Sequence, residues 1–544
     1  MNKIAQYLNE HILGEITASK AIRQQFSRDG SVLSITPELV MFPRVTNDIR
    51  KAARFAWQLA EKGHVLPVTV RGFGGDQTGA SIGKGLMINT TAHLNSIIFV
   101  ATKEKDRFVH VQPGVTFKTL SDTLLWHGLY IPAAPEADAY STVGGVVANN
   151  SGGQFSGRYG LIGDWVTRLE VVLANGDLIE TTRLSRREFN KKIGLQTFEG
   201  ELYRKLDGLI EDNQELITKE LAQVDRDNTG YARIAKVKQR DGSFDLTPLF
   251  IGSQGTLGII SEIVLKADYT NKDQTILVAS VASGDTARDI ADSLQSLEPA
   301  SLDIIDGALF KAAVGHGKTY SFIDTDTDDA AVLYVQWNDF SDAMRARKLK
   351  KAIKLLGGRE AMITTSDDVS VDELLAVRQV AASLYANAAD GHSYVPLIDG
   401  AQIPGDRQEE FAQAVRALAV KHHLSLPLHV RVLDGTVFTR PLLQLDKVAD
   451  KQKVFKLMSE YASLVEKHGG IFVADGSEGR LKANAAYSVL DQDVRRLYEE
   501  IRAIFDPFGT LNPGVKQSSD IKDLVHALRS DYDTSDFAQF APHN

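Results

Sequence analysis

The chain contains no cysteine among its 544 residues. This absence excludes disulfide bonds, iron–sulfur clusters, thiolate zinc sites, cysteine nucleophiles and a flavin linked through cysteine. It does not identify the compartment, because a reduced cytosol and a disulfide-free exported protein are both compatible with it. Any catalytic chemistry must therefore come from other side chains or from a cofactor.

A basic surface and long apolar runs are also missing. The formal net charge is −9, whereas a nucleic-acid partner would require a basic face. We interpret the basic cluster Arg183–Lys192 as a solvated surface segment. No run approaches the roughly 18 apolar residues of a membrane span, and Met1–Ile16 lacks the apolar core of a signal peptide. We expect a cytoplasmic protein with no nucleic-acid partner and no transmembrane segment, and leave peripheral membrane attachment open.

The composition, with 43% hydrophobic and 24% charged residues, is that of a soluble globular protein. The chain is too long for one ordinary domain, so we expect two. An amphipathic helix is predicted from Lys3 to about Phe26, and a hairpin turn at Asn175–Gly176. From about Thr270 strands and helices alternate, which is typical of an α+β domain with helices covering one face of a sheet. The predicted division is a first domain over 1–269 with a charged helical insertion at about 182–245, a second over 270–502, and a C-terminal segment over 503–544.

The stretch Pro132–Gly160 is rich in glycine and contains two Gly-Gly pairs, Gly144-Gly145 and Gly152-Gly153. Such pairs are poor material for a helix or strand interior, because glycine loses the most conformational entropy when it is ordered. They suit a backbone whose N–H groups lie against a diphosphate. A flexible linker is the alternative, but it would not need the apolar run VGGVVANN. We interpret the stretch as a cofactor cradle.

A second glycine-rich turn, Arg71–Ser81, follows a predicted strand. It begins like a dinucleotide fingerprint, but Gln77 stands where the third glycine belongs, and no helix pattern follows. A phosphate-binding loop of the Walker kind is excluded as well, because Gly85 follows Lys84 where serine or threonine is required. The turn is therefore a second candidate cradle outside both common nucleotide motifs.

Six motifs occur in a characteristic order: RGFGGDQTG (Arg71–Gly79), QPGV (Gln112–Val115), STVGGVVANNSGG (Ser141–Gly153), RYGLIGDWV (Arg158–Val166), IGSQGTLGIISE (Ile251–Glu262) and FDPFGTLNPG (Phe505–Gly514). With these motifs the chain resembles the FAD-linked oxidases that carry a PCMH-type (vanillyl-alcohol-oxidase-like) flavin domain. The nearest branch is that of the D-lactate, glycolate and D-2-hydroxyglutarate dehydrogenases. The resemblance extends from about Phe26 to Gly514.

The resemblance implies an α+β protein. A PCMH-type FAD-binding domain of two subdomains would be followed by a ferredoxin-like cap domain with an antiparallel sheet, which covers the isoalloxazine. The two glycine-rich segments would bind the diphosphate, Gly258 and Ile260 would line the adenosine side, and Asn512 would lie near the flavin ring. The FAD would be non-covalent, since there is no cysteine and Gly75-Asp76 stands where a histidyl-linked relative has its histidine. The residues assigned to FAD in this way are Arg71, Gly72, Phe73, Gly74, Gly75, Asp76, Gln77, Gly79, Pro135, Ser141, Thr142, Gly144, Gly145, Asn149, Gly152, Gly153, Tyr159, Gly258, Ile260 and Asn512.

The chain departs from that branch at its metal site. Metal-dependent members carry a His-x-Gly-Asp-Gly-Asn-x-His motif and a later Glu-His pair. Here Arg431 and Phe438 stand where the two histidines belong, and Asp475-Gly476 replaces the Glu-His pair. Because the imidazole ligands are gone, we predict no metal. The lost histidine is also the general base that the family would use, which weakens a simple 2-hydroxy-acid assignment.

Four residues are candidates for the chemistry. Arg378 matches the arginine of the family's cap helix and would bind a substrate carboxylate with its guanidinium fork, with Arg431 adding positive charge. His429 or Asp475 would accept the hydroxyl proton. The alternatives are a surface arginine on an amphipathic helix and a histidine satisfied on a strand.

The sequence thus predicts an FAD-dependent oxidoreductase that oxidises a small D-2-hydroxy acid, with hydride transfer to flavin N5 and without a metal. The electron acceptor is a quinone, an electron-transfer protein or oxygen, and homodimer formation is left open. One alternative is oxidation of another alcohol, such as a sugar, a polyol or an aromatic alcohol. The other is a flavin-binding electron-transfer or assembly protein that oxidises no alcohol.

Overall fold

The computed structural model of the chain describes residues 2–103, 106–222, 226–271, 273–315, 317, 320–324, 329–385 and 391–532. The chain forms two compact units, of which unit 1 comprises residues 1–152, 161–268 and 473–529, and unit 2 comprises 153–160, 269–472 and 530–544. The chain therefore leaves unit 1 inside the glycine-rich stretch and returns to it at Leu161 and again at Val473. The domain limits drawn from the sequence stay a prediction, and residues 533–544 of the predicted C-terminal segment lie outside the described residues.

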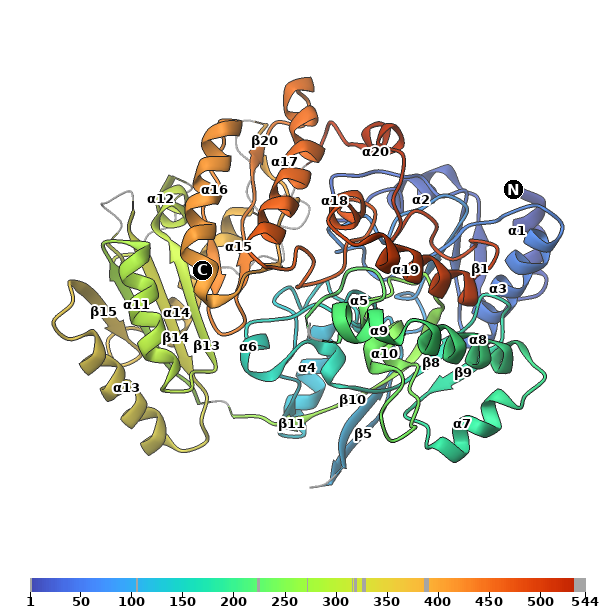
Figure 1. Ribbon diagram of the computed structural model, residues 1–544, viewed down its shortest axis with the longest axis horizontal. Coiled ribbons are helices and arrows are strands. Elements are labelled where there is room, and N and C mark those ends of the chain that lie inside the picture. The colour runs from blue at the N-terminus through green and yellow to red at the C-terminus, as the bar shows by residue number, and fades with distance from the viewer. Residues whose placement is uncertain are drawn as a thin grey trace. The chain divides into compact units, whose positions relative to one another are not determined.

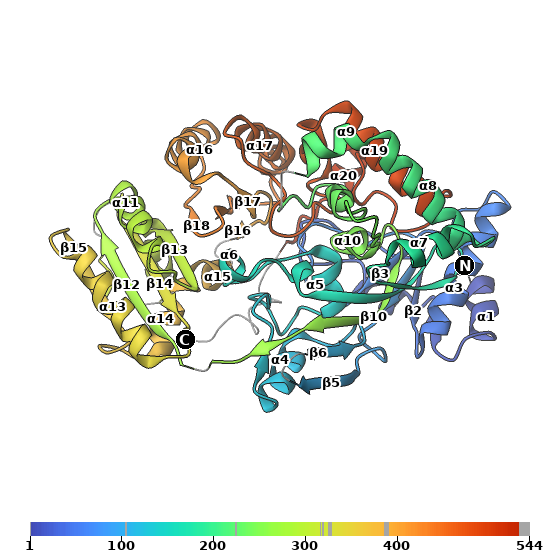
Figure 2. The same cartoon turned by 60° about the horizontal axis from the view of Figure 1, so that its bottom comes forward.

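Unit 1 contains two main sheets. One has the order β1-β2-β4-β3, with β2 and β3 both parallel to β4, and the other has the order β5-β6-β10-β8-β9. Figure 2 shows β5, β6 and β10 side by side. The strands are β1 (Glu15–Thr17), β2 (Leu39–Phe42), β3 (Val68–Arg71), β4 (Leu86–Asn89), β5 (Ile97–Lys103), β6 (Asp106–Val111), β7 (Leu129–Tyr130), β8 (Val166–Val172), β9 (Leu178–Thr181) and β10 (Ile259–Lys266), while β11 (Asp268–Tyr269) spans the change of unit.

Helix α3 of unit 1 buries Ile49, Ala52 and Ala56 against the four-stranded sheet. The helices of unit 1 are α1 (Asn2–Asn9), α2 (Lys20–Gln25), α3 (Thr46–Glu61), α4 (Phe117–Trp126), α5 (Val143–Asn149), α7 (Arg186–Ile193), α8 (Phe198–Asp212), α9 (Gln214–Leu216), α10 (Thr247–Phe250), α18 (Ala483–Ser488), α19 (Gln492–Phe505) and α20 (Ile521–Ala527). The predicted hairpin is confirmed, because Gly176 has a φ of +83° between β8 and β9. The charged segment after β9 is helical, as predicted.

The prediction of one helix from Lys3 to about Phe26 is wrong. The structure has two short helices, α1 and α2, with strand β1 between them. Gly14 lies so close to β2 that a Cβ there would be 2.2 Å from the carbonyl oxygen of Phe42. Because β1 pairs antiparallel with β2, the chain must cross the sheet edge here and cannot continue as a helix.

Unit 2 is built on an antiparallel sheet of the order β15-β12-β14-β13-β18-β19-β17. Its strands are β12 (Thr275–Val281), β13 (Ser301–Asp306), β14 (Ala331–Trp337), β15 (Ala361–Thr365), β16 (Ser393–Tyr394), β17 (Ala401–Gln402), β18 (His429–Arg431), β19 (Thr436–Phe438) and β20 (Leu442–Leu443). Its helices are α6 (Ser156–Tyr159), α11 (Gly284–Gln295), α12 (Gly307–Gly315), α13 (Asp342–Leu356), α14 (Val371–Arg378), α15 (Val380–Tyr385), α16 (Gln408–His422) and α17 (Val448–Lys467).

Helices cover both faces of this sheet (Figure 1), so the expectation that they cover one face is wrong. Helices α11 and α13 pack on one face, and α12, α14 and α15 pack on the other. The reason is that alternate residues of the central strands are apolar on both sides: Leu277 and Leu333 face one core, and Ile276 and Val332 the other. Within the described residues, no helix has the length and apolar character to cross a membrane.

Candidate functional site

The turn after β3 presents a run of backbone N–H groups. Within the described part of the chain, the N–H groups of residues 73–76 donate no hydrogen bond to protein. The turn is fixed from within by Asp76, whose carboxylate accepts the N–H groups of Thr78 at 3.0 Å and Ala80 at 2.7 Å. Successive unsatisfied N–H groups form a concavity that binds anions. The turn therefore fits the oxygens of a diphosphate.

Both predicted cradles meet in unit 1. A Cβ on Gly72 would lie 2.3 Å from Oγ1 of Thr142, and one on Gly75 would lie 3.5 Å from the carbonyl oxygen of Tyr140. A Cβ on Gly144 would lie 2.6 Å from the Pro113 side chain. Glycine at position 72 thus allows the two backbone segments to approach each other, because a side chain there would clash with Thr142.

The expectation that the Gly-Gly pair at 144–145 avoids a helix is wrong, because α5 includes both residues. The helix forms because Thr142 caps it, accepting the N–H of Gly145 at 3.2 Å, and because Val143 and Val147 are fully buried. Asn150 then ends it with a φ of +49°. The first N–H groups of α5 all have protein partners, so the turn at 73–76 is the better site for the diphosphate.

Asp475, a predicted candidate base, lies in unit 1 and accepts the N–H of Gly152 at 2.8 Å. The same loop contacts Asn149, whose side-chain oxygen accepts the N–H of Ser477 at 2.9 Å and a bond from Gln254 at 3.1 Å. The loop that contains Asp475 thus holds the glycine-rich stretch in place. The role of Asp475 as a proton acceptor stays a prediction.

Asn512, expected near the flavin ring, is buried and has a φ of +41°. Its amide nitrogen donates to the carbonyl oxygens of Ala80 and Gln254, both at 2.8 Å. Its oxygen accepts a bond from Arg480 at 3.0 Å. Burial lowers the pKa of Arg480 to about 10. Sequence reasoning missed this residue, which follows Asp475-Gly476 in the segment VADGSEGR. Asn512 therefore joins the first turn to the C-terminal segment.

The other assigned residues are distributed over both units. Gly258 packs against Val171, where a Cβ would come within 2.5 Å, and Ile260 is buried in β10. Gly153 and Tyr159 belong to unit 2, in which the Tyr159 hydroxyl bonds to Asn338. The remaining residues lie in the two glycine-rich segments or just before them, namely Arg71, Phe73, Gln77, Gly79, Pro135 and Ser141.

We expect Gly74→Ala to weaken FAD binding by about tenfold or more. Gly74 has a φ of +86°, and a Cβ there would lie 2.1 Å from the Arg71 guanidinium, so left-handed strain of about 1–2 kcal/mol would add to a displacement of Arg71. Gly63→Ala is the matched control, because Gly63 has a φ of +82° and no atom within 4 Å of its Cβ position. Flavin absorbance per chain measures the effect. Equal flavin content in the two variants would contradict the assignment.

A buried carboxylate lies beside this turn. Asp29 accepts a bond from the Ser81 hydroxyl at 3.0 Å and the N–H of Ser31 at 3.0 Å. Burial, and then the charge of Asp76, raise the pKa of Asp29 to about 6. In the unfolded chain this pKa is about 4, so the folded state binds the extra proton between these values.

We therefore expect the contribution of Asp29 to stability to fall as pH rises from about 4 to about 6, by about 3 kcal/mol at most. Asp29→Asn keeps the shape and removes the titration. The difference in unfolding free energy between wild type and D29N, measured by urea titration at several pH values, should change across this window. Asp122→Asn is the control, since Asp122 is exposed. A constant difference from pH 4 to pH 7 would refute the prediction.

In unit 2 a polar cluster lies on one face of the sheet. Asp303 of β13 is opposite Arg431 of β18 and opposite Tyr334 of β14. Arg378, at the end of α14, donates from Nε to Oδ2 of Asp303 at 2.7 Å, and Nε2 of His429 lies 3.6 Å from Oδ1. The structure thus brings together the predicted residues Arg378, His429 and Arg431. The fourth candidate, Asp475, belongs to unit 1.

Asp303, which sequence reasoning missed, is the centre of this cluster. It is fully buried, and burial alone would raise its pKa, but the charge of Arg378 and the neighbouring His429 side chain outweigh burial and lower the pKa to about 2. The carboxylate is therefore ionised at neutral pH. A signal was present in the sequence, since an aspartate interrupts the apolar strand SLDII.

Arg431 is held beside the returning glycine-rich segment. It donates to the carbonyl oxygen of Gly153 at 2.7 Å and lies 3.6 Å from the carboxylate of Asp434, which accepts the Ser156 hydroxyl at 2.6 Å. Its guanidinium also lies 4.9 Å from the ring centre of Phe438. These contacts fix Arg431 at one end of the polar cluster.

Metal ligands do not converge in the described part of the chain: no group of three or more His, Asp or Glu side chains there is placed to hold an ion. The prediction of a metal-free protein stays a prediction.

Two family models match the chain. A model described as FAD binding domain matches residues 37–182, and one described as FAD linked oxidases, C-terminal domain, matches residues 270–515. Among curated relatives, a D-2-hydroxyglutarate dehydrogenase of Haemophilus influenzae is 25% identical over 540 residues, which cover 96% of this chain and 52% of the relative. The glycolate oxidase subunit GlcD of Bacillus subtilis is 25% identical over 500 residues, covering 91% of this chain and 92% of the relative. The chain thus spans about half the length of the D-2-hydroxyglutarate dehydrogenases it matches first.

Among solved structures, p-cresol methylhydroxylase with substrate bound has a TM-score of 0.69 at 14% identity, covering 95% of this chain and 96% of that one. At this identity the likeness concerns the fold alone. The predicted PCMH-type α+β fold is confirmed.

Proposed function

Because the chain belongs to the FAD-linked oxidases, we propose that it is an FAD-dependent oxidoreductase that oxidises a small D-2-hydroxy acid of the lactate, glycolate or 2-hydroxyglutarate kind. FAD would be bound non-covalently by unit 1, and no metal would take part. The names of the relatives that match over most of this chain support the substrate class. The observation that carries the proposal is the group formed by Asp303, Arg378 and His429.

The oxidation removes a hydride from the carbinol carbon and a proton from its hydroxyl, and leaves a 2-oxo acid. When bound, FAD supplies the hydride acceptor at N5. His429 would accept the proton, since Asp303 is ionised and would stabilise the imidazolium that forms. The guanidinium of Arg378, oriented by Asp303, would bind the substrate carboxylate. Arg431 would add a second positive charge on the same sheet face.

An absorption spectrum of the purified protein, followed by anaerobic addition of D-lactate, glycolate and D-2-hydroxyglutarate with and without chelator, tests the proposal. Flavin bands that bleach equally in chelator are the expected result. Bleaching that chelator abolishes would overturn the metal-free reaction. Bands that persist with all three acids would overturn the substrate class, and a panel of sugars, polyols and phenols would then distinguish another alcohol oxidase from a flavoprotein without alcohol oxidation. Absence of flavin bands after reconstitution would overturn the cofactor assignment.

A further inference from the structure

Helix α13 carries a stripe of basic side chains on its solvent-exposed side. Its inward side packs against the sheet of unit 2 with Leu349, Ala352 and Leu356. Because an α-helix has 3.6 residues per turn, Arg347, Lys350 and Lys354 lie together on the opposite side, and all three are exposed. The segment 343–359 contains no acidic residue that would interrupt this basic stripe.

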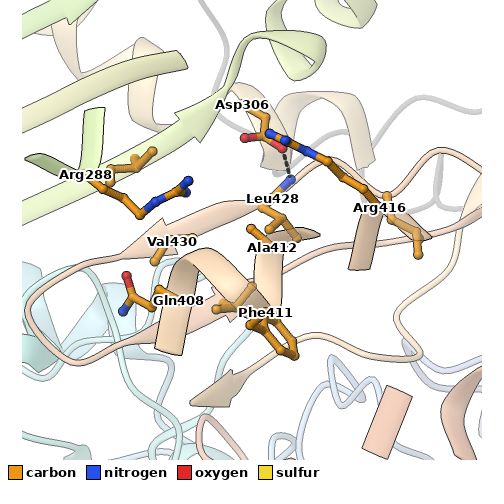
Figure 3. Close-up of a pocket in the computed structure, with 11 residues that line it drawn as sticks. Arg288, Asp306, Gln408, Phe411, Ala412, Arg416, Leu428 and Val430 are labelled. Carbon is orange, nitrogen blue, oxygen red and sulfur yellow. Dashed lines mark hydrogen bonds between the residues drawn. The ribbon is translucent and has the colours of Figure 1, made fainter. Parts of the chain in front are cut away.

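Helix α11 carries the opposite charge. It contacts α13 and covers the same face of the sheet (Figure 1). Its inward side is formed by Ala287, Ile290, Ala291 and Leu294. The opposite side presents an acidic stripe of Asp285, Asp289 and Asp292, which are all exposed. The basic residue of this helix, Arg288, is half-buried, and Figure 3 shows its side chain extending toward the small cavity that Val430 helps to line.

The two stripes do not neutralise each other within one chain. Asp285 pairs with Arg288 of its own helix. Within the part of the chain that the structure describes, ion-pair partners are absent for Asp289, Asp292, Arg347, Lys350 and Lys354. Packed helices have axes about 8–10 Å apart, and the side chains of both stripes point outward from the sheet. Both stripes are therefore available to a partner.

The stripes match in spacing and run in opposite directions. Steps of four and then three residues separate Asp285, Asp289 and Asp292, and the same steps separate Lys354, Lys350 and Arg347 in reverse order. The sheet also places the two stripes at the same level. Strand β12, which precedes α11, ends at Val281, and this residue pairs with Ala361, which begins β15 after α13. The start of α11 and the end of α13 thus lie at the same end of the sheet.

We propose that this face of unit 2 binds a second copy of the chain and forms a dimer with twofold symmetry. A half-turn about an axis parallel to the two helices, midway between them, places α11 of each copy over α13 of the other. Asp285, Asp289 and Asp292 then face the partner's Lys354, the partner's Lys350 and the partner's Arg347 in the same order. Each of these pairings occurs twice. The dimer goes beyond the proposed oxidation and does not depend on it.

A second copy fits this face better than a partner of one charge. An anionic lipid surface or an acidic protein would be attracted to the basic stripe of α13 but repelled by the acidic stripe of α11. A basic partner would meet the reverse difficulty. The same surface turned by half a turn presents both signs in the required places.

The contact is expected to be weak and sensitive to salt. Helix α13 has 15 residues and is therefore about 22 Å long, and two helices side by side are about 20 Å wide, so that each copy contributes roughly 400 Å². Met344, Ile353 and Leu355 add exposed apolar surface beside the basic stripe. Contacts of this size are typical of transient complexes, and salt screens exposed ion pairs.

Sedimentation velocity of the full-length holoprotein, from low to high micromolar concentration and at low and high salt, tests the dimer. Lys350→Glu and Asp289→Lys each reverse one side of the central pair, and a double variant carries both changes. Lys456→Glu on α17 and Glu499→Lys on α19 are the matched controls, because they reverse exposed charges outside the two stripes. Flavin content and far-UV circular dichroism verify that each variant is folded.

We expect a concentration-dependent dimer at low salt that dissociates at high salt. K350E and D289K should each weaken it by about tenfold or more, because like charges then meet at two symmetric places. The double variant should dimerise again, and an equimolar mixture of K350E and D289K should form a heterodimer, since opposite charges face each other once more in both cases. K456E and E499K should behave as wild type.

A monomer at every concentration in low salt would overturn the proposal, as would a dimer that K350E and D289K leave intact. A dimer weakened by K350E but not by D289K would place an acidic surface other than α11 opposite α13 and overturn it too. Failure of both the double variant and the mixture to dimerise would show that the two stripes do not pair with each other.

Discussion

Replacement of His429 by glutamine is expected to lower kcat/KM for the proposed D-2-hydroxy acid substrate by about 10²–10⁴-fold, with FAD content unchanged. The imidazole lies 3.6 Å from a carboxylate that is ionised at neutral pH, so proton uptake from the substrate is stabilised there and not in bulk solvent. Glutamine keeps a similar length and polarity but accepts no proton. Anaerobic stopped-flow reduction of the flavin measures the step directly.

Asp303→Asn tests the role of the ionised carboxylate beside His429. The amide fills the same space next to Arg378 but carries no charge, so we expect a loss of about 10²-fold or more in flavin reduction. A purely structural role would leave the pH profile of kcat/KM unchanged, whereas loss of the ionised carboxylate should shift its acidic limb to lower pH, because the imidazolium loses its counter-charge.

His422→Gln is the matched control for both variants. His422 is as buried as His429, at 6% exposure for each, and lies 2.9 Å from a carboxylate oxygen of Glu460, but on α16 rather than in the polar cluster. Its replacement should leave flavin reduction within about twofold of wild type, as expected away from reacting groups. If H422Q and H429Q reduce flavin at the same rate, His429 is not the base.

The sequence allowed prediction of features that depend on neighbouring residues. The turn after β3 follows from glycines at 72, 74 and 75 placed directly behind a strand, and the hairpin follows from Asn175–Gly176. Helix α5 could not be predicted in this way. Each glycine in a helix costs about 1 kcal/mol relative to alanine, and that cost is offset by tertiary burial of Val143 and Val147, which the local sequence does not contain.

The candidate site was predicted only in part, because the contacts that form it are also tertiary and are not contained in the local sequence. Arg378 and His429 were identified by their side-chain chemistry and by a family resemblance. Their shared partner Asp303 is 75 residues before Arg378 and still farther from His429, so only the pairing of β13 with β18 brings the three together. The contact of Asp475 with the N–H of Gly152 could not be predicted either, because the two residues lie far apart in the sequence.

The second large effect is expected at a fully buried ion pair in unit 1. Nζ of Lys516 lies 2.6 Å from Oε2 of Glu478, and neither side chain is exposed to solvent. Glu478 also accepts the N–H of Gly230 at 2.7 Å, and Lys516 donates to the carbonyl oxygen of Asn228 at 2.9 Å. The pair thus joins the loop of Asp475, the C-terminal segment and the insertion.

Lys516→Met should destabilise unit 1 by about 3–5 kcal/mol, because it leaves the charge of Glu478 buried without a partner. Lys118→Met is the control: its pair with Asp122 is exposed, so we expect a change of less than about 1 kcal/mol. A Trp337→Phe background leaves tryptophans only in unit 1, so that urea unfolding followed by fluorescence reports this unit. A loss in K516M no larger than in K118M would contradict the prediction.

The double variant Glu478→Gln with Lys516→Met distinguishes the loss of the ion pair from the burial of one unpaired charge. The double variant carries neither charge. We expect it to be more stable than K516M, since the unpaired charge is removed and the glutamine oxygen still accepts the N–H of Gly230. FAD content should follow the same order. The loop that carries Glu478 also contains Asp475 and Ser477, which hold Gly152 and Asn149 of the cofactor cradle. If K516M loses stability but keeps full FAD affinity, the pair supports the fold alone and not the geometry of the cradle.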